Sequence, residues 1–323
     1  MAPMVGFRSS RLAPLALMVM ALLWGSTLVV MKSAYAHLSP TDLLANRFVV
    51  GALALGVLMP RAWRANPRTI ARGLSLGMLF GAGQVLQALG LRSTSASVNG
   101  FIGGLYVVVT PLLGAMLFGR RVPRQIWTAV ALATVGLGSL ALNPADLGAG
   151  IGIGELLTFA ASVCFAGQIV ALGRFATASN VASLALYQTI GAALVCMVCA
   201  APGGIRIASS GQEWFAVIYL GVLCGAMIAF LQSWAQARVE ATRASVIMCT
   251  EPLWGAAFAI WLAGDPVTLQ VILGGASILA AMILVVRPPR RRRGTAALRP
   301  DRPVRCSRGA HPAGDPALTS GSE

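Results

Sequence analysis

The sequence predicts an all-α polytopic membrane protein with ten transmembrane helices, arranged as two five-helix repeats of inverted topology. Three observations lead to this prediction. First, the 323 residues are 57% hydrophobic and only 11% charged, whereas a soluble domain carries about 25% charged residues. Second, apolar runs long enough to cross a bilayer recur along the chain. Third, short motifs of the first half return in the same order in the second half.

The first half of the chain contains five apolar runs. A helix that rises about 1.5 Å per residue needs about 20 apolar residues to cross a hydrocarbon core about 30 Å thick. The first run is longer than the usual core of a secretory signal, so we expect it to be retained. The runs lie at about 12–31 before Lys32, 42–59 before Pro60, 70–90 before Arg92, 95–118 before Gly119, and 125–142 after Arg124.

Five further runs make up the second half, after a glycine-rich stretch, "GAGIGIG", that we interpret as a flexible hinge. Charged or turn-forming residues bound these runs as well. Connections are short throughout, so we expect no soluble domain between the helices. The runs lie at about 152–173 before Arg174, 181–200 after Asn180, 214–236 before Arg238, 244–263 after Arg243, and 267–286 before Arg287.

Basic residues are distributed unevenly between alternate loops, and positive charge is retained on the cytoplasmic side of a membrane. The poorer side has Lys32, Arg92 and Arg206, and the nine arginines of the C-terminal tail fall on the richer side. Both termini are therefore predicted to be cytoplasmic, in a bacterial-type inner membrane. The richer side has twelve basic residues in its loops: Arg8, Arg11, Arg61, Arg64, Arg68, Arg72, Arg120, Arg121, Arg124, Arg174, Arg238 and Arg243.

The tail, residues 287–323, is rich in proline, glycine and charge and has little to bury, so we expect it to be disordered. Its cluster from Arg287 to Arg293 is interpreted as a topology anchor, with binding of anionic lipid head groups as the alternative. Nucleic-acid binding is excluded because the basic residues lie in short loops and a tail rather than on one folded face.

Three pairs of motifs relate the two halves. The stretch "STSASV" from Ser93 matches "ATRASV" from Ala241, 148 positions later. "LWGSTLVVMK" parallels "FAGQIVALGR" at an offset of 142, and "GRRVPRQ" parallels "GDPVTLQ" at an offset of 145. Because five helices per repeat is an odd number, the second copy enters the membrane from the opposite side, a pattern typical of secondary transporters. The expected units are residues 1–143, the first repeat, 144–286, the second repeat, and 287–323, the tail.

Residues 12–286 also carry a family resemblance. "WGSTLVVMKSAYAHLSPTDLLANRF", "QALGLRSTSASVNGFIGGLYVVVTPLLGAML" and "TRASVIMCTEPLWGAAFAIWLAGDPVTLQVILGGASIL" resemble the EamA-type, ten-helix branch of the drug/metabolite transporter superfamily. The resemblance implies an inner-membrane permease, often an exporter of amino acids or other small metabolites, without ATP hydrolysis of its own. Many members have Gly-Glu after the fourth and ninth helices, where this chain has Gly119-Arg120 and Gly264-Asp265.

Glu251 and Pro252 lie together in an otherwise apolar run. An ionised carboxylate facing lipid there costs a few kcal/mol, so Glu251 is expected to face protein or a water-filled cavity. Pro252 lacks a backbone N–H and should break the helix, leaving a carbonyl near Met248 without its helical partner. Glu251 is then either a substrate or proton-coupling group or a structural residue that bonds a neighbouring helix. Pro111, which follows Thr110, is the expected break in the first repeat. It lies fourteen residues after Ser97, whereas Pro252 lies seven residues after the aligned Ser245, so the two halves diverge at this point.

Arg47 lies inside the second run. It is expected to snorkel outward along its own stem, to hold an anionic group, or to form a gating or structural ion pair with Glu155 at the start of the sixth run. Polar and aromatic residues of other runs are candidate substrate contacts, with helix–helix packing as the alternative for each. These candidates are Trp24, Gln84, Asn99, Tyr106, Gln168, Gln232 and Trp234.

The favoured function is a secondary-active transporter of a small amphipathic metabolite, such as an amino acid, moved outward by alternating access between the repeats. Proton coupling through Glu251 is one expected mechanism, and no cofactor or metal is expected, since the sequence has only two histidines and no paired Cys-x-x-Cys motifs. A channel or a flippase for lipid-linked metabolites is the alternative. A membrane enzyme is disfavoured because no catalytic cluster lies in the runs, and the oligomeric state is left open between monomer and homodimer.

Overall fold

The computed structural model describes residues 12–35, 37–94, 96–119, 122–141, 152–263 and 267–286. All of these residues belong to one compact unit, 1–288. The described residues form helices and short connections and contain no β-strand. The all-α fold class predicted from hydropathy is therefore confirmed for this part of the chain.

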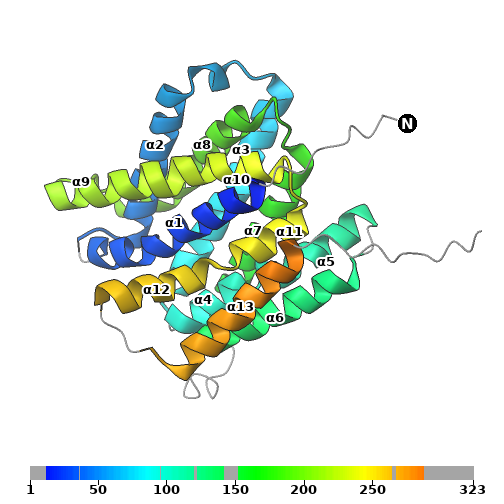
Figure 1. Cartoon of the computed structure of the whole chain (residues 1–323). Helices are drawn as coiled ribbons and strands as arrows, with labels where there is room; N and C mark the ends of the chain where they lie inside the picture. Colours follow the sequence, from blue (N-terminus) through cyan, green and yellow to red (C-terminus); the bar gives the residue numbers. More distant parts are fainter. Residues whose placement is uncertain are drawn as a thin grey trace, which may run out of the picture. The chain divides into compact units, whose positions relative to one another are not determined.

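Helices of the first half coincide with the predicted apolar runs, except that the fourth run is divided into two helices (Figure 1). The division lies at Leu105, directly after Gly103 and Gly104. Glycine costs about 1 kcal/mol relative to alanine in a helix interior, so two in succession weaken the helix there. The helices are α1 (Leu12–Ala34), α2 (Pro40–Leu58), α3 (Pro67–Gly90), α4 (Ala96–Gly104), α5 (Tyr106–Phe118) and α6 (Arg124–Ala141), with a short 3₁₀ helix η1 (Pro60–Trp63).

The second half is more irregular. Its eighth predicted run contains a π-helix, η4 (Tyr219–Met227), between α9 (Gly211–Ile218) and α10 (Ile228–Gln236). The ninth run is divided into α11 (Ala241–Met248) and α12 (Glu251–Ala263). The remaining helices are α7 (Ile153–Phe175), α8 (Val181–Ala200), η3 (Ala201–Gly203) and α13 (Leu269–Val286).

Several helices begin where the sequence provides a cap. The side chain of Asn66 accepts a hydrogen bond from the backbone N–H of Thr69 at 2.7 Å, and Pro67 occupies the first turn of α3. Ser210 and Glu213 form a reciprocal capping box at the start of α9. These interactions satisfy backbone donors that have no partner within the helix. Local chemistry therefore fixes these helix starts before any tertiary packing.

Seven helical stretches among the described residues are long and apolar enough to cross a membrane. Large apolar side chains such as Val57, Met116 and Trp261 are 78–80% exposed, as expected for helices that face lipid rather than water. The protein is therefore a polytopic membrane protein. That ten helices cross the bilayer, with both termini cytoplasmic, stays a prediction.

The helices pack in pairs drawn from the two halves of the chain. Helix α3 contacts α7 and α8, α2 contacts α8 and the π segment η4, and α6 runs alongside α13 (Figure 1). Helix α1 contacts α12 and α10. One core of buried apolar residues, including Leu17, Val107 and Ile169, draws on both halves of the chain, and smaller clusters pack α8 against α2 and α3. Residues far apart in sequence consequently meet in the middle of the bundle, where the candidate site lies.

Candidate substrate site

Glu251 is the first residue of α12. Helix α11 ends at Met248, the carbonyl of Ile247 accepts from the backbone N–H of Thr250 at 3.1 Å, and α12 restarts with Pro252 in its first turn. Proline is well accommodated there because its missing N–H would have no helical partner. The sequence placed Glu251 about two turns inside a single helix. The structure instead places it at a helix N-terminus, where the helix dipole favours a negative charge.

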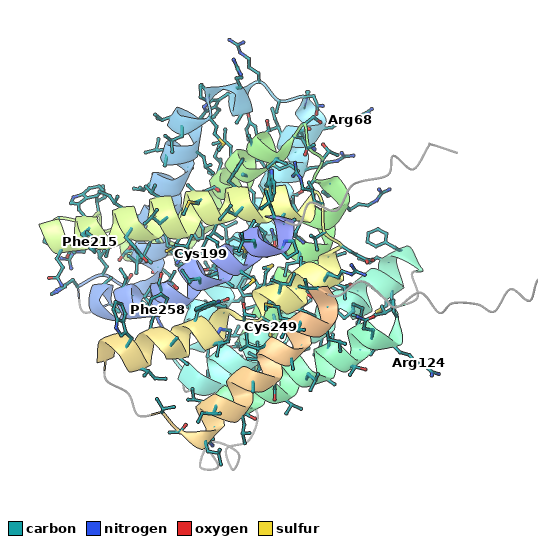
Figure 2. All side chains as sticks on the ribbon, viewed as in Figure 1. Arg68, Arg124, Cys199, Phe215, Cys249 and Phe258 are labelled. Carbon is teal, nitrogen blue, oxygen red and sulfur yellow. The ribbon has the colours of Figure 1, made fainter. Side chains whose placement is uncertain are left out.

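A cavity of about 430 Å³, which we call the central cavity, opens beside this break. Figure 2 labels Cys249 at the junction of α11 and α12, and this residue lines the cavity together with Glu251. The residues of the α4–α5 break, Gly103, Gly104 and Tyr106, line the same cavity. Both broken helices therefore converge on one space. Seven residues expected from the sequence line it: Trp24, Asn99, Tyr106, Gln168, Gln232, Glu251 and Pro252.

The central cavity lies towards one end of the bundle. Leu91 at the C-terminal end of α3, Gly100 in the first turns of α4 and Val271 in the first turn of α13 all line it. These helix ends are opposite to the N-terminal end of α3, which carries Arg68 and follows the connection that contains Arg61 and Arg64. The cavity is therefore displaced away from the arginine-rich loops.

An aromatic cluster forms one wall of the central cavity. The ring centroid of Phe80 lies 5.9 Å from that of Trp24 and 5.7 Å from that of Phe165. Sequence reasoning selected Trp24 and missed both phenylalanines. Their spacing from candidate residues could have indicated them. Phe165 lies three residues before Gln168, and Phe80 lies four residues before Gln84, so each pair shares one face of its helix.

Three buried glutamines connect the helices beside this wall. Gln232 donates its side-chain N–H to the Oε1 atom of Gln168 at 3.2 Å, and Gln168 donates to Oε1 of Gln188 at 2.8 Å. Asn99 donates to the hydroxyl of Thr158 at 2.8 Å and to the carbonyl of Gln87 at 3.1 Å. The amides therefore join helices to one another while also lining the cavity.

The expected ion pair between Arg47 and Glu155 is wrong. Arg47 points into the bundle, where its terminal nitrogen donates to Oε1 of Gln84 at 2.9 Å. Glu155 instead accepts from the backbone N–H of Gly152 at 2.9 Å and from the side chain of Thr94. Its carboxylate is occupied by capping the first turn of α7, so it is not directed towards α2. Gln84, expected in the cavity lining, serves as the partner of Arg47 and does not line the central cavity.

Two further expectations are corrected. Trp234 does not line the central cavity, because it lies about 200° around α10 from Gln232, which does. The guanidinium of Arg238 lies against its ring, with Cζ 4.2 Å from the ring centroid. Pro111 does not break its helix, since α5 continues through it and the break lies six residues earlier, at Leu105. The break in this run directly follows Gly103 and Gly104, which weaken the helix there.

A second cavity of about 540 Å³ lies on the arginine-rich side of the bundle. It is lined by Pro111 of α5, Arg174 at the end of α7, and Arg238 and Glu240 of the connection between α10 and α11. On α7, Ile169 lines the central cavity and Val170 lines the second cavity. On α10, Gln232 lines the central cavity and Gln236 lines the second cavity. The two cavities are therefore lined by adjacent residues of α7 and by residues about one turn apart on α10.

A hydrogen bond closes this separating layer. Gln236 donates its side-chain N–H to the carbonyl of Ile169 at 3.0 Å, and Gln236 is 3% exposed. Thr110 in the same layer is fully buried. We call this layer the barrier. It joins the Gln236 side chain of α10 to the Ile169 backbone carbonyl of α7.

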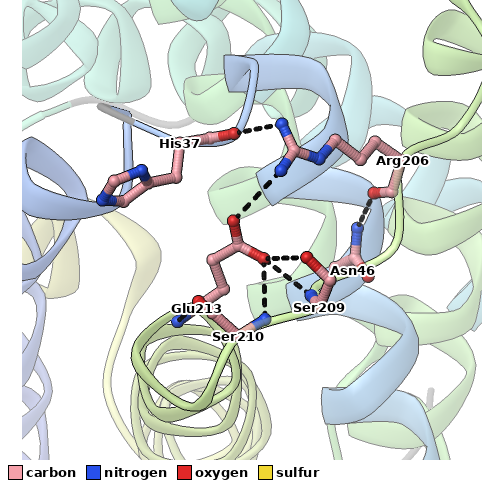
Figure 3. A network of polar contacts seen from close by, with 6 residues as sticks. All are labelled: His37, Asn46, Arg206, Ser209, Ser210 and Glu213. Atoms are coloured by element: carbon pink, nitrogen blue, oxygen red, sulfur yellow. Dashed lines mark hydrogen bonds and ion pairs between the residues drawn. The ribbon is translucent and has the colours of Figure 1, made fainter.

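A polar network lies at the other end of the bundle, and sequence reasoning did not identify it (Figure 3). Arg206 donates to the carbonyl of His37 at 2.8 Å and forms an ion pair with Glu213 at 3.4 Å. Asn46 of α2 donates to the carbonyl of Arg206 at 2.9 Å. The connection before α9 is thereby attached to α2 and to the connection between α1 and α2. Only the capping pattern of Ser210 and Glu213 was visible in the sequence.

The network predicts unequal effects of removing its two charges. Oε2 of Glu213 accepts from the N–H of Ser209 at 2.6 Å and of Ser210 at 3.2 Å, and the Glu213 side chain is 4% exposed, whereas Arg206 is 57% exposed. We expect Glu213→Gln to lower the Tm of the purified protein more than Arg206→Gln does, because exposed ion pairs contribute little. In the double variant, the Tm should be close to that of Glu213→Gln alone. An equally large fall for Arg206→Gln would contradict the assignment.

Comparison with known proteins gives consistent similarities. The family model described as the EamA-like transporter family matches residues 11–142 and again residues 152–287. Two proteins of Archaeoglobus fulgidus, each described as an uncharacterized transporter, are 26% and 24% identical to the chain. The first similarity covers 84% of this chain and 85% of the relative, and the second covers 88% and 100%.

One solved structure, described only as the crystal structure of a protein, has a TM-score of 0.72 to this structure. The two sequences are 19% identical, and the match covers 84% of this chain and 95% of the other. At this identity the likeness shows a shared fold. It carries no information on substrate.

Proposed function

Because the chain belongs to the EamA-like transporter family, we propose that it is a secondary-active carrier of a small amphipathic solute. The observation that carries this proposal is the convergence of two broken helices, α4–α5 and α11–α12, on one cavity that holds Glu251. In secondary transporters, substrate and coupling-ion sites are formed by discontinuous helices at the interface of two repeats. Such sites expose polar backbone only where it lines a cavity.

The packing of the helices supports two inverted repeats with a boundary near residue 144. If α1 to α6 and α7 to α13 are equivalent sets, the contact of α1 with α12 corresponds to that of α7 with α5. The same equivalence exchanges α2 with α8 and α6 with α13, so each of these two contacts is its own counterpart. Each half also contains one broken helix at its fourth position. We propose ten membrane-spanning segments on this basis, with both termini cytoplasmic in a bacterial-type inner membrane.

The two cavities support alternating access. The central cavity is displaced away from the arginine-rich loops, and the barrier at Gln236 and Ile169 separates it from the second cavity. With the arginine-rich loops cytoplasmic, the central cavity lies on the outer side of the barrier. A channel would need a continuous polar path, so the barrier favours a carrier.

The lining of the central cavity indicates the kind of solute. Trp24, Phe80 and Phe165 provide apolar and aromatic surface, while Gln232, Gln168 and Glu251 provide polar groups. A cavity of about 430 Å³ is within the range of small-molecule sites, about 300–1,000 Å³. We propose an amino acid or a similar solute with a cationic group that Glu251 binds, and, from the family resemblance, outward transport. Glu251 would release a proton when the substrate binds, and this exchange would couple substrate transport to proton movement.

The experiment that tests the proposal uses the purified full chain in proteoliposomes. A thermal-shift screen against metabolites first identifies ligands, because a ligand that binds the folded state raises its Tm. Uptake of the radiolabelled ligand is then measured with and without unlabelled ligand inside the vesicles. We expect saturable uptake that is accelerated by internal ligand, which is characteristic of a carrier. Flux that does not saturate and shows no such acceleration would indicate a channel and refute the proposal.

A further inference from the structure

Arg47 is a buried cation without a carboxylate partner in the described part of the chain. The residue is 2% exposed, and its Nε atom forms no hydrogen bond. One terminal nitrogen donates to Gln84 at 2.9 Å, and the guanidinium carbon lies 4.6 Å from the centroid of the Phe48 ring. Asp42, one and a half turns earlier on α2, is bonded to Ser39 and to the backbone N–H of Arg206.

The other described acids lie elsewhere. Glu155 caps α7, Glu213 caps α9, Glu240 lines the second cavity and Glu251 lines the central cavity. An arginine keeps its charge in all protein environments. A buried charge without a partner is costly, so buried charges are paired or hold an ion. None of the described acids is therefore paired with Arg47, whose other terminal nitrogen meets only the Sδ atom of Met31 at 3.9 Å.

A small chamber of about 20 Å³ adjoins Arg47. A chamber of this size accepts one water-sized sphere, for which about 10–15 Å³ is needed. Phe48, Gln188, Cys224 and Gly225 contribute to its lining. The last two belong to the π-helix η4, whose wide turn packs against α2. Isolated π segments occur frequently at functional sites, so their presence beside a buried cation is a second, independent observation.

Gln188 supplies a donor at the same place. Its Oε1 atom accepts a hydrogen bond from Gln168 at 2.8 Å. Gln188 is therefore the last glutamine in this series of hydrogen bonds, and its side-chain nitrogen carries N–H groups that can donate to a ligand. Trp24, Phe80 and Gln232 line both this chamber and the central cavity, and so form a wall one side chain thick between them.

We propose that this chamber is an anion site that holds one monovalent anion of chloride size between the Arg47 guanidinium and the Gln188 amide. The chamber is too small for a solute that bears a carboxylate. The site is separate from the proposed substrate site and goes beyond the proposed function. It neutralises Arg47 within the bundle and joins α2, α8 and η4 through one ion.

The test measures the Tm of the purified full chain in nanodiscs at constant ionic strength, with gluconate replaced stepwise by chloride. We expect a saturable rise of about 4 °C, because an ion that binds only the folded state stabilises it by mass action. Arg47→Gln should abolish the rise, and Arg206→Gln, which removes a 57% exposed arginine at the end of the bundle, should retain it. Acetate, which is larger than the chamber, should not replace chloride.

A second measurement does not depend on the folding of a variant. Crystals of the wild-type protein grown or soaked in bromide should give an anomalous peak in the chamber beside Arg47. The proposal is overturned if chloride leaves the Tm unchanged, if Arg47→Gln responds as the wild type does, or if acetate stabilises equally. A bromide peak confined to the central cavity would also overturn it.

Discussion

Replacing Glu251 with glutamine is expected to reduce the rate of transport at least about 10-fold and to remove its dependence on pH. Glutamine has the same shape and keeps a hydrogen-bonding group in the central cavity, but it cannot bind or release a proton or balance a cationic substrate. A positioned acid or base contributes about 10²–10⁴-fold to general acid–base steps of enzymes, and we expect a smaller effect in a carrier, where no covalent bond of the substrate breaks. Uptake into proteoliposomes at external pH values from 5.5 to about 8.5 measures both quantities.

The controls separate loss of the carboxylate from loss of structure. Glu251→Asp keeps the acid and should retain a pH-dependent rate, although lower than that of the wild type. Glu155→Gln makes the same chemical change at another helix N-terminus, outside the central cavity, and should transport as the wild type does. If Glu251→Gln transported at the wild-type rate with an unchanged pH profile, Glu251 would be a structural residue.

Replacing Gly77 with alanine is expected to give the largest loss of stability among glycine-to-alanine substitutions at the described glycines. A Cβ atom at this position would collide with the carbonyl oxygen of Gln188 and lie 2.9 Å from the backbone nitrogen of Ala192. These are backbone atoms of α8, so helices α3 and α8 would have to separate. Overpacking of this kind costs about 1–3 kcal/mol and occasionally more. We expect about 3 kcal/mol here, or a fall in Tm of roughly 6–12 °C.

Gly114 provides the matched control. It also lies inside a helix, α5, but a Cβ atom there would meet no atom within 4 Å. Gly114→Ala should therefore leave the Tm unchanged or raise it slightly, because alanine is favoured by about 1 kcal/mol over glycine in a helix. Equal Tm values for Gly77→Ala and Gly114→Ala in nanodiscs would show that α3 and α8 do not approach as closely as described.

Helix breaks show where local sequence was informative and where it was not. Pro252 coincides with a break because proline is tolerated in the first turn of a helix and disfavoured within it. Pro111 was given the same role by analogy between the repeats, yet α5 passes through it. The break in the first half lies at Leu105, after two glycines. Proline alone therefore does not locate a break when a weaker helical segment lies nearby.

The partners of the polar residues likewise show what the sequence could predict and what it could not. Gln168 and Gln232 were predicted near one another only as members of a common lining, and the structure joins them directly. Arg47 was paired with Glu155 because topology placed both at the same face of the membrane. The pairing failed because the side of a helix that a residue occupies changes by about 100° per residue, so depth in the membrane does not determine direction.

The sequence by itself determined the class of the protein, the approximate limits of the apolar helices and the relation between the two halves. These properties depend on composition and on local spacing, since any apolar run of sufficient length must satisfy its backbone as a helix in a bilayer. Only the tertiary structure decided that Glu251 begins a helix, that Phe80 and Phe165 complete the wall of the central cavity, and that Arg47 is buried beside Gln84. Those features depend on how helices from the two halves rotate and pack against one another, and no local pattern encodes that rotation.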